Sequence, residues 1–461
     1  MHTHIQTTVA IAALVLAYGA SALLGARADE TSRRPGDPTR GQRLLQETSY
    51  LGPAFDQETF DNVWRVWPEP LRASAEASTS DERRQMAYDR YGLDAREGDA
   101  QARPVQYAVD DQGRWSMTCL TCHAGSVAGR LVPGLPNAHL ALQTLMDDIR
   151  ATKRLLEKPW TSADVAQSLF PLNKTVGTTN AVMFSVSLLS MRDVHLDFRP
   201  LRLLPRLRHH DMDAPAWWNL RKRTHLYIDG FAPKGARPLM QFTLMPQNGP
   251  ETIRGWEQDF VDILAYLESL EPPAWPYEID AELAAQGSRA FDRACASCHG
   301  TYGDRATYPN RRVPIGLVGT DRLRLDAITP DQRRTYAKSW FTHYDPAGVV
   351  IEPDGYVAPP LDGIWASAPY LHNGSVPTLW HMLHPDERPS LWRRSRNGYD
   401  AERVGLEIET SPSLPPEGDD AAARRRWFDT SRPGKSKTGH RFPDVLTAAE
   451  KRAVLEYLKT L

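Results

Sequence analysis

The sequence predicts a mostly α-helical protein that consists of two similar halves with long loops. Residues 263–270 and 454–461 share Leu, Tyr, Leu and Leu in the same register, and both stretches have the apolar spacing of an amphipathic helix. A Cys-x-x-Cys-His pentapeptide occurs once in each half, at 119–123 and 295–299. Strand-like alternation is sparse along the chain. This internal repeat predicts two units of the same architecture.

The first element along the chain is an apolar segment at residues 9–24, which Ala26-Arg27-Ala28 follows. An apolar core followed by a small-x-small pattern is typical of a secretory signal peptide, here residues 1–28. No Lys or Arg precedes the core, and the segment is nearly long enough to remain as an uncleaved anchor. We therefore expect a periplasmic or otherwise exported protein, with a membrane span only if this segment is retained.

Two helices are predicted next to the pentapeptides. Apolar residues at helical spacing predict one helix over 142–156, after the first pentapeptide, and another over 281–294, which leads into the second. Thr447 and Glu450 have the spacing of a capping box, which predicts where the last helix begins.

A linker is predicted between the halves, because Glu-Pro-Pro-Ala-Trp-Pro at 271–276 cannot be helical. Each half then begins near its pentapeptide and closes with one of the repeated helices. The predicted organisation is a signal peptide at 1–28, an N-terminal domain at 29–270, the linker at 271–276 and a C-terminal domain at 277–461.

The two pentapeptides contain all four cysteines of the chain: Cys119, Cys122, Cys295 and Cys298. Two thiols at this spacing can form thioethers with the vinyl groups of one porphyrin, and the next residue, His123 or His299, then lies under the iron. Redox pairs or one zinc site of four thiolates are the alternatives, and a histidine directly after both pairs argues against them. The sequence thus predicts two covalently bound c-type haems and a cytochrome c-like fold in each half.

The sixth ligand of each iron decides between chemistry and simple electron transfer. For the second haem the strongest candidate is His440, in the loop before the closing helix, where Gly439 allows the backbone to approach the porphyrin. Met382, His381 and His384 are rivals.

For the first haem, the corresponding loop contains no histidine. Met245 and His139 are the available ligands, but a methionine between Leu244 and Pro246 is typical of core packing, and His139 can instead cap the helix that follows. We favour an open or weakly ligated first haem.

Residues 361–379 form a third feature, an ordered loop that contains Trp365, Tyr370 and His372. Its Ala-Pro-Tyr-Leu-His-Asn-Gly-Ser segment resembles the segment that follows the second haem motif in the di-haem cytochrome c peroxidase superfamily. The Trp-Ala-Ser before it, the Val-Pro after it and the Gly-His near the carboxyl end are similar to the rubber oxygenase branch.

This resemblance implies a division of labour between the haems. His123 would be the proximal ligand of the active-site haem, and His299 that of an electron-transfer haem whose second ligand is His440. The peroxidases place a methionine ligand where this chain has Asp386, and this departure favours the rubber oxygenase branch.

The resemblance also implies a tryptophan between the haems, for which Trp217 and Trp218 are the candidates; packing at a domain interface explains them equally well. His225 and Phe231 are candidates for the distal pocket of the first haem, where an apolar wall suits oxygenase chemistry and a histidine suits peroxidase chemistry. With His372, these residues complete the set of catalytic candidates.

The predicted function is a di-haem c-type oxidoreductase that reacts with peroxide or dioxygen at the N-terminal haem, while the C-terminal haem transfers or stores electrons. The alternative is a non-enzymatic electron carrier with both haems six-coordinate. The expected partners are an electron donor or acceptor protein and an organic substrate. A net charge of −2 gives no indication of nucleic-acid binding. The chain is much shorter than known rubber oxygenases, so cleavage of the polymer is not implied.

Overall fold

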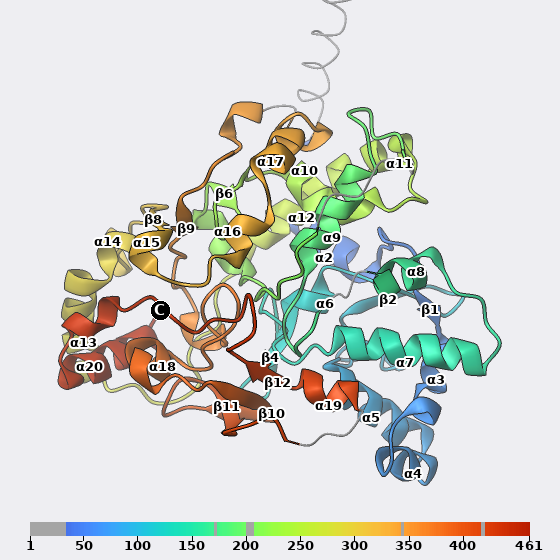
Figure 1. Ribbon diagram of the computed structural model, residues 1–461, viewed down its shortest axis with the longest axis horizontal. Coiled ribbons are helices and arrows are strands. Elements are labelled where there is room, and N and C mark those ends of the chain that lie inside the picture. The colour runs from blue at the N-terminus through green and yellow to red at the C-terminus, as the bar shows by residue number, and fades with distance from the viewer. Residues whose placement is uncertain (1–33, 170–172, 200–206, 343–344, 416–419) are drawn as a thin grey trace, which may run out of the picture.

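The computed structural model describes residues 34–169, 173–199, 207–342, 345–415 and 420–461 (Figure 1). The predicted signal peptide at 1–28 lies outside the described residues. The structure is 44% helical and 14% strand, so helices predominate as predicted. Within the described ranges, no helix is both long enough and apolar enough to cross a membrane.

The N-terminal half contains most of the helices that enclose the first pentapeptide. Its principal helices are α2 (Pro38–Glu47), α3 (Gln57–Asp61), α4 (Leu71–Glu76), α5 (Ser80–Tyr91), α6 (Leu120–His123), α7 (Leu142–Leu155), α8 (Ser162–Leu169), α9 (Ala181–Ser190), α10 (Ala236–Leu239), α11 (Pro250–Gly255) and α12 (Glu257–Ser269). Its strands are β1 (Phe55–Asp56), β2 (Tyr107–Val109), β3 (Arg114–Met117), β4 (Ala124–Val127), β5 (Arg130–Pro133), β6 (His225–Leu226) and β7 (Ala232–Pro233).

The C-terminal half begins with the helix that the sequence predicts. Its helices are α13 (Ala281–Ala294), α14 (Ala296–His299), α15 (Ile315–Val318), α16 (Leu323–Ala327), α17 (Pro330–Ala337), α18 (Leu379–Leu383), α19 (Ala421–Arg425) and α20 (Ala448–Leu458). Its strands are β8 (Arg312–Pro314), β9 (Gly355–Val357), β10 (Leu391–Asp400), β11 (Gly405–Thr410) and β12 (Trp427–Asp429). The capping box of Thr447 and Glu450 is present at the start of α20.

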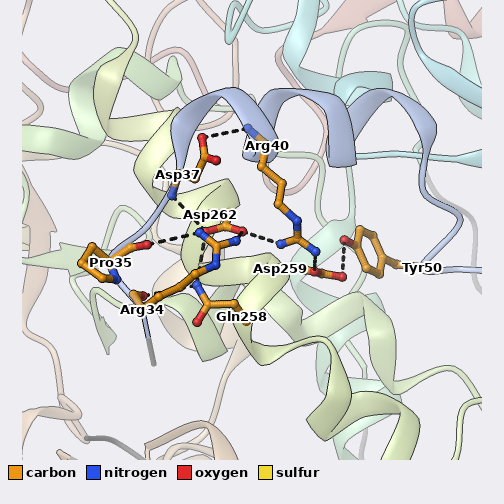
Figure 2. A network of polar contacts seen from close by, with 8 residues as sticks. All are labelled: Arg34, Pro35, Asp37, Arg40, Tyr50, Gln258, Asp259 and Asp262. Atoms are coloured by element: carbon orange, nitrogen blue, oxygen red, sulfur yellow. Dashed lines mark hydrogen bonds and ion pairs between the residues drawn. The ribbon is translucent and has the colours of Figure 1, made fainter. Parts of the chain in front are cut away.

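A polar network fixes the N-terminal helix α2 on the closing helix α12 (Figure 2). The Asp262 carboxylate accepts hydrogen bonds from the backbone of Asp37 (2.9 Å) and from the side chains of Arg34 and Arg40. Arg40 also pairs with Asp259 at 2.5 Å. The side chain of Asp262 is fully buried, and burial of a carboxylate is tolerated here because four donors surround it, the fourth being the amide of Gln258 at 3.2 Å.

Each half contains the same crossing of two helices. A Cβ atom added to Gly41 of α2 would lie 2.1 Å from the backbone oxygen of Asp262, and one added to Gly287 of α13 would lie 1.9 Å from that of Ala453. Asp262 and Ala453 both lie one helical turn before the repeated tyrosine of the closing helix. In Figure 1, α13 and α20 lie side by side at the left edge of the molecule. The two crossings therefore use a glycine at equivalent positions.

The first half begins earlier than its pentapeptide suggests. The partner of α12 is α2, which ends at Glu47, long before Cys119, and residues between them form α3–α5 and the sheet β1–β3–β2. In the second half, by contrast, α13 leads directly into α14. The first half thus has an inserted region between its opening helix and its pentapeptide.

The predicted linker at 271–276 has no regular secondary structure, but it is firmly packed. The ring of Trp275 lies 5.2 Å from that of Trp365, edge to face, and Trp365 Nε1 donates to the carbonyl of Pro273 at 3.0 Å. These contacts attach the linker to the loop at 361–379.

The largest strand was not predicted. β10 runs over ten residues between β11 and β12 in a three-stranded antiparallel sheet, with Trp392 opposite Phe428. Its sequence, Leu-Trp-Arg-Arg-Ser-Arg-Asn-Gly-Tyr-Asp, lacks apolar alternation, and its pairing with distant strands replaces that local signal.

Candidate functional site

The first pentapeptide forms the short helix α6, which is held from both sides. The hydroxyl of Thr121 donates to the backbone oxygen of Gln106 at 2.6 Å, and the backbone of Asn137 donates to the carbonyl of Cys122 at 2.9 Å. Cys119, the cap residue before α6, and Cys122 are three positions apart, which places them on the same side of this helical turn. This arrangement suits two thioether bonds to a single porphyrin.

His123, at the end of α6, is enclosed by protein. Burial lowers its pKa to about 4, and the backbone of Pro215 opposes this decrease. Nδ1 makes no hydrogen bond of normal geometry to any described residue. The ring stacks on Trp217, with 4.6 Å between the ring centres and 25° between the planes. His123 is therefore a neutral imidazole, the form that binds a metal ion.

The second pentapeptide continues from α13 into α14. His299 Nδ1 lies 2.8 Å from the carbonyl of Pro359, which can only accept a hydrogen bond. This contact assigns the proton to Nδ1 and leaves Nε2 free to bind a metal ion. Pro215 and Pro359 each follow an alanine. This repeated Ala-Pro pair marks both prolines in the sequence, but the sequence predictions did not include it.

His440 lies opposite His299, with 6.1 Å between the ring centres. Two imidazoles that bind one iron from opposite sides, each through a bond of about 2 Å, have ring centres about 6 Å apart. Burial, together with His299 and Arg388, lowers the pKa of His440 to about 3. Its Nδ1 is buried without a hydrogen-bond partner among the described residues. The spacing of these two side chains fits one haem iron.

The loop of His440 is held in an unusual backbone conformation. His440 has a φ of +49° and Gly439 one of +79°, and the backbone of His440 donates to Val318 at 2.6 Å. The guanidinium of Arg388 donates to the carbonyl of Gly439 at 2.8 Å. A Cβ atom on Gly439 would lie 2.2 Å from the backbone of Gly319, so glycine is required for this approach.

The rival ligands of the second haem have other partners. His381 Nδ1 lies 2.8 Å from the hydroxyl of Thr378, and His384 stacks on Trp380 at 3.9 Å. Met382 packs against the core of the C-terminal half. Asp386, at the position of the peroxidase methionine, pairs with Arg441 at 2.8 Å.

The two rival ligands of the first haem lie in different surroundings. Met245 is 4% exposed and belongs to the core of the N-terminal half. His139 lines a cavity of about 450 Å³ beside Arg394 and Arg426, and burial together with these two arginines lowers its pKa to about 4. The alternative role of His139 as a helix cap is wrong, because the cap residue of α7 is Ala141, which makes no side-chain capping bond.

Trp217 and Trp218 lie between elements of the two halves. Trp217 stacks on His123, whereas Trp218 is fully buried and donates from Nε1 to the carbonyl of Asp362 at 2.7 Å. Asp362 also pairs with Lys222 at 2.7 Å. The adjacent tryptophans thus connect the first proximal histidine to the loop that begins beside Pro359.

The other three candidates do not gather at one point. Both ring nitrogens of His225 have partners, the hydroxyl of Thr224 at 3.0 Å and the carbonyl of Gly348 at 3.1 Å. Phe231 belongs to the core that packs against Cys119, and its ring lies 4.6 Å from that of Tyr336.

His372 packs on a different ring. Its ring centre is 4.5 Å from that of Tyr356, in the C-terminal half.

None of the four cysteines, all of which lie within the described residues, forms a disulfide bond. The described residues contain no group of three or more His, Cys, Asp or Glu side chains arranged to hold a metal ion. A zinc site of four thiolates thus has no support in the structure.

The comparisons with known proteins point to the C-terminal half. Residues 355–393 match the family model described as RoxA-like, cytochrome c-like. The chain is 29% identical over 256 residues to the uncharacterized protein y4iM of Sinorhizobium fredii (strain NBRC 101917 / NGR234), covering 50% of this chain and 56% of that protein. It is also 29% identical over 259 residues to the uncharacterized protein y4iJ of the same strain, covering 42% and 41%.

The chain therefore spans about half the length of the curated relatives it matches. The family match contains Pro359, the partner of His299, and the loop with His372. It supports the rubber oxygenase-like branch of c-type cytochromes, and its cytochrome c-like character implies that the protein binds c-type haem.

Proposed function

We propose that this protein is an exported di-haem c-type cytochrome with oxidoreductase activity. Peroxide or dioxygen reacts at the haem attached to Cys119 and Cys122, and an organic molecule is the substrate. The haem attached to Cys295 and Cys298 transfers or stores electrons that it exchanges with a partner protein.

The observation that carries this proposal is the difference between the two proximal histidines. His299 faces His440 at a distance suited to one iron between them, and two strong ligands favour electron transfer. Among the described residues, the ring that packs on His123 is Trp217, and no histidine faces it in the same way. This difference supports an open sixth position at the first haem, which binding of peroxide or dioxygen would require.

The polypeptide orients the histidine ligands and connects the two sites. Pro359 orients His299, while Arg388 holds the loop that presents His440. Haem, when bound, supplies the one-electron chemistry and the affinity for oxygen. Trp217 stacks on His123, and its neighbour Trp218 donates to Asp362 in the loop next to Pro359, so two indole rings lie between His123 and that loop.

An apolar distal side of the first haem would favour dioxygen over peroxide, because it limits protonation of bound oxygen, whereas cleavage of peroxide benefits from an acid or base. The core against which Cys119 packs is apolar and contains Phe231, while both ring nitrogens of His225 have other hydrogen-bond partners.

Electron paramagnetic resonance of the protein as isolated tests the proposal. We expect one low-spin haem from the His299 and His440 pair and one high-spin haem at His123. Peroxide added to the oxidised protein should change only the high-spin signal, and dioxygen added to the reduced protein should change the visible absorption of the haem at His123. Two low-spin signals that respond to neither oxidant would instead establish the non-enzymatic electron carrier.

A further inference from the structure

A buried charged cluster connects the two halves at Asp229. Arg324 from α16 donates to one carboxylate oxygen at 3.0 Å, and Arg333 from α17 donates to the other at 2.8 Å. Asp229 is fully buried, and both arginine side chains are only 1% exposed. One carboxylate thus faces two guanidinium groups in the interior.

The cluster has more positive than negative charge. Two further arginines lie near this cluster. Arg223 is close enough to Asp229, and Arg312 is close enough to Arg333, for the charges of each pair to interact. Four cations therefore surround one described anion.

Several donors of the cluster have no acceptor. Nε and Nη1 of Arg324 and Nη1 of Arg333 are enclosed without a hydrogen-bond partner among the described residues, as are the Nε atoms of Arg223 and Arg312. Buried cationic donors without an acceptor are unfavourable. Their number indicates that an anionic group that is not among the described residues completes the site.

Neighbouring titratable groups do not supply that negative charge. Burial, and then the positive charge of Arg324, lowers the pKa of His372 to about 3. Burial likewise lowers the pKa of His210 to about 4, and its Nε2 has no partner among the described residues. Tyr227 and Tyr356, also beside Arg324, have pKa values that burial raises, so both stay uncharged.

The cluster is attached to the surroundings of both haem motifs. On the side of the second motif, the hydroxyl of Tyr356 accepts from the backbone of Leu325 in α16 and donates to the carbonyl of Asp321, whose carboxylate binds the backbone of Ser436 in the loop of His440. On the side of the first motif, Arg333 lies 5.0 Å from the ring centre of Phe231.

We propose that Arg324 and Arg333, oriented by Asp229, form a buried carboxylate-binding site that holds a haem propionate. Guanidinium groups bind carboxylates through paired hydrogen bonds, and their charge is retained when buried. A small free carboxylate has the same chemistry and is the competing source. This inference rests on the haem of the proposed function, but not on reactivity toward oxygen.

Redox titration of the holoprotein at pH 8, followed by the absorbance of each haem, tests the site. Arg324→Gln and Arg333→Gln each remove a positive charge, which should stabilise ferric iron and lower one midpoint potential by at least 59 mV, a tenfold change for one electron. Arg322→Gln and Arg334→Gln are matched controls, because these neighbours are 64% and 50% exposed. In the two control variants, the equilibrium constant between ferric and ferrous haem should change less than twofold.

The Asp229→Asn variant distinguishes an effect of charge from a general effect of misfolding. It removes the negative charge, so it should raise the potential that Arg324→Gln lowers, whereas loosened packing would move both variants in the same direction. Shifts of the same sign in the two variants would overturn the proposal. So would Arg324→Gln and Arg333→Gln variants that behave like their exposed controls.

Sodium acetate distinguishes the two sources of carboxylate. If a propionate occupies the site, sodium acetate should leave both midpoint potentials of the unaltered protein unchanged. A saturable shift by acetate that Arg324→Gln abolishes would show a free carboxylate there and overturn the assignment to haem. Both potentials can be measured even in a pure electron carrier, so failure of the oxidoreductase function leaves this test intact.

Discussion

At the scale of single residues, the histidines of the two proposed iron sites are neutral. Burial keeps His123 and His440 uncharged at neutral pH, since it lowers their pKa values to about 4 and about 3. An uncharged imidazole binds a metal ion without first losing a proton. Desolvation by the protein thus prepares these side chains as ligands.

His440→Ala should convert one haem from low spin to high spin at pH 7. The variant removes one of two strong axial ligands and leaves the thioether bonds intact. Visible absorption and electron paramagnetic resonance measure the change. His384→Ala is the matched control, because this rival histidine stacks on Trp380. A low-spin spectrum that persists in His440→Ala would exclude His440 as the ligand.

Trp217→Phe should slow electron exchange between the haems at least tenfold, because it keeps a ring against His123 but removes the indole. Flash reduction followed at the absorbance of each haem measures the rate. Trp160→Phe, at a 43% exposed position, provides the control. If the rate stays the same while the free energy of unfolding falls, Trp217 serves in packing alone.

At the scale of secondary-structure elements, the glycine crossings hold each half together. Gly287 allows the backbones of α13 and α20 to touch, and Phe291, one turn later, packs on Tyr457 with 5.3 Å between ring centres. Gly41 has the same role between α2 and α12. A helix pair in such close contact positions the pentapeptide that α13 leads into.

Gly287→Ala should lower the free energy of unfolding by about 1–3 kcal/mol, since the added methyl group overlaps the backbone of Ala453. Gly316→Ala, in the short helix α15 with open space around its Cβ position, should be neutral or stabilising by up to about 1 kcal/mol. Denaturant titration followed by far-ultraviolet circular dichroism compares the two. Equal stabilities would show that α13 can move away from α20 without cost.

At the scale of the whole molecule, stability against acid depends on buried carboxylates. Burial opposes ionisation of Asp262, but hydrogen bonds from Asp37, Arg40 and their neighbours outweigh it and lower the pKa. A lowered pKa in the folded state stabilises the protein at every pH above the unfolded value of about 3.9. The contribution is lost as the pH falls through the folded pKa.

Asp262→Asn should therefore destabilise the protein by about 1.5–3 kcal/mol at pH 7, the usual effect of losing hydrogen bonds to a charged group. The difference from the unaltered protein should begin to shrink below about pH 4, where the carboxylate of the unfolded chain becomes protonated, and should vanish once the pH falls below the lowered pKa of the folded state. Unfolding at pH 7 and at pH 3 measures it. Asp386→Asn, an exposed ion pair with Arg441, should show little difference at either pH. A constant difference across pH would contradict the ionic role of Asp262.

The sequence by itself determined the features that depend on local spacing. The pentapeptides, the helix at 281–294 and the capping box of Thr447 each follow from neighbouring residues, and the structure has both helical features at those positions. His440 was reached partly by its distance from the closing helix. The distance between the rings of His440 and His299 follows only from the tertiary structure, because the two side chains come from segments far apart in the chain.

Only the tertiary structure decided which distant residues meet. Burial and long-range pairing placed α2 on α12, put Trp217 against His123 and enclosed Arg324 with Asp229. These contacts leave no periodic trace in the sequence, since each partner looks locally like an ordinary surface or core residue. Desolvation then sets the charge of every histidine at the sites, and desolvation exists only once the chain has folded around them.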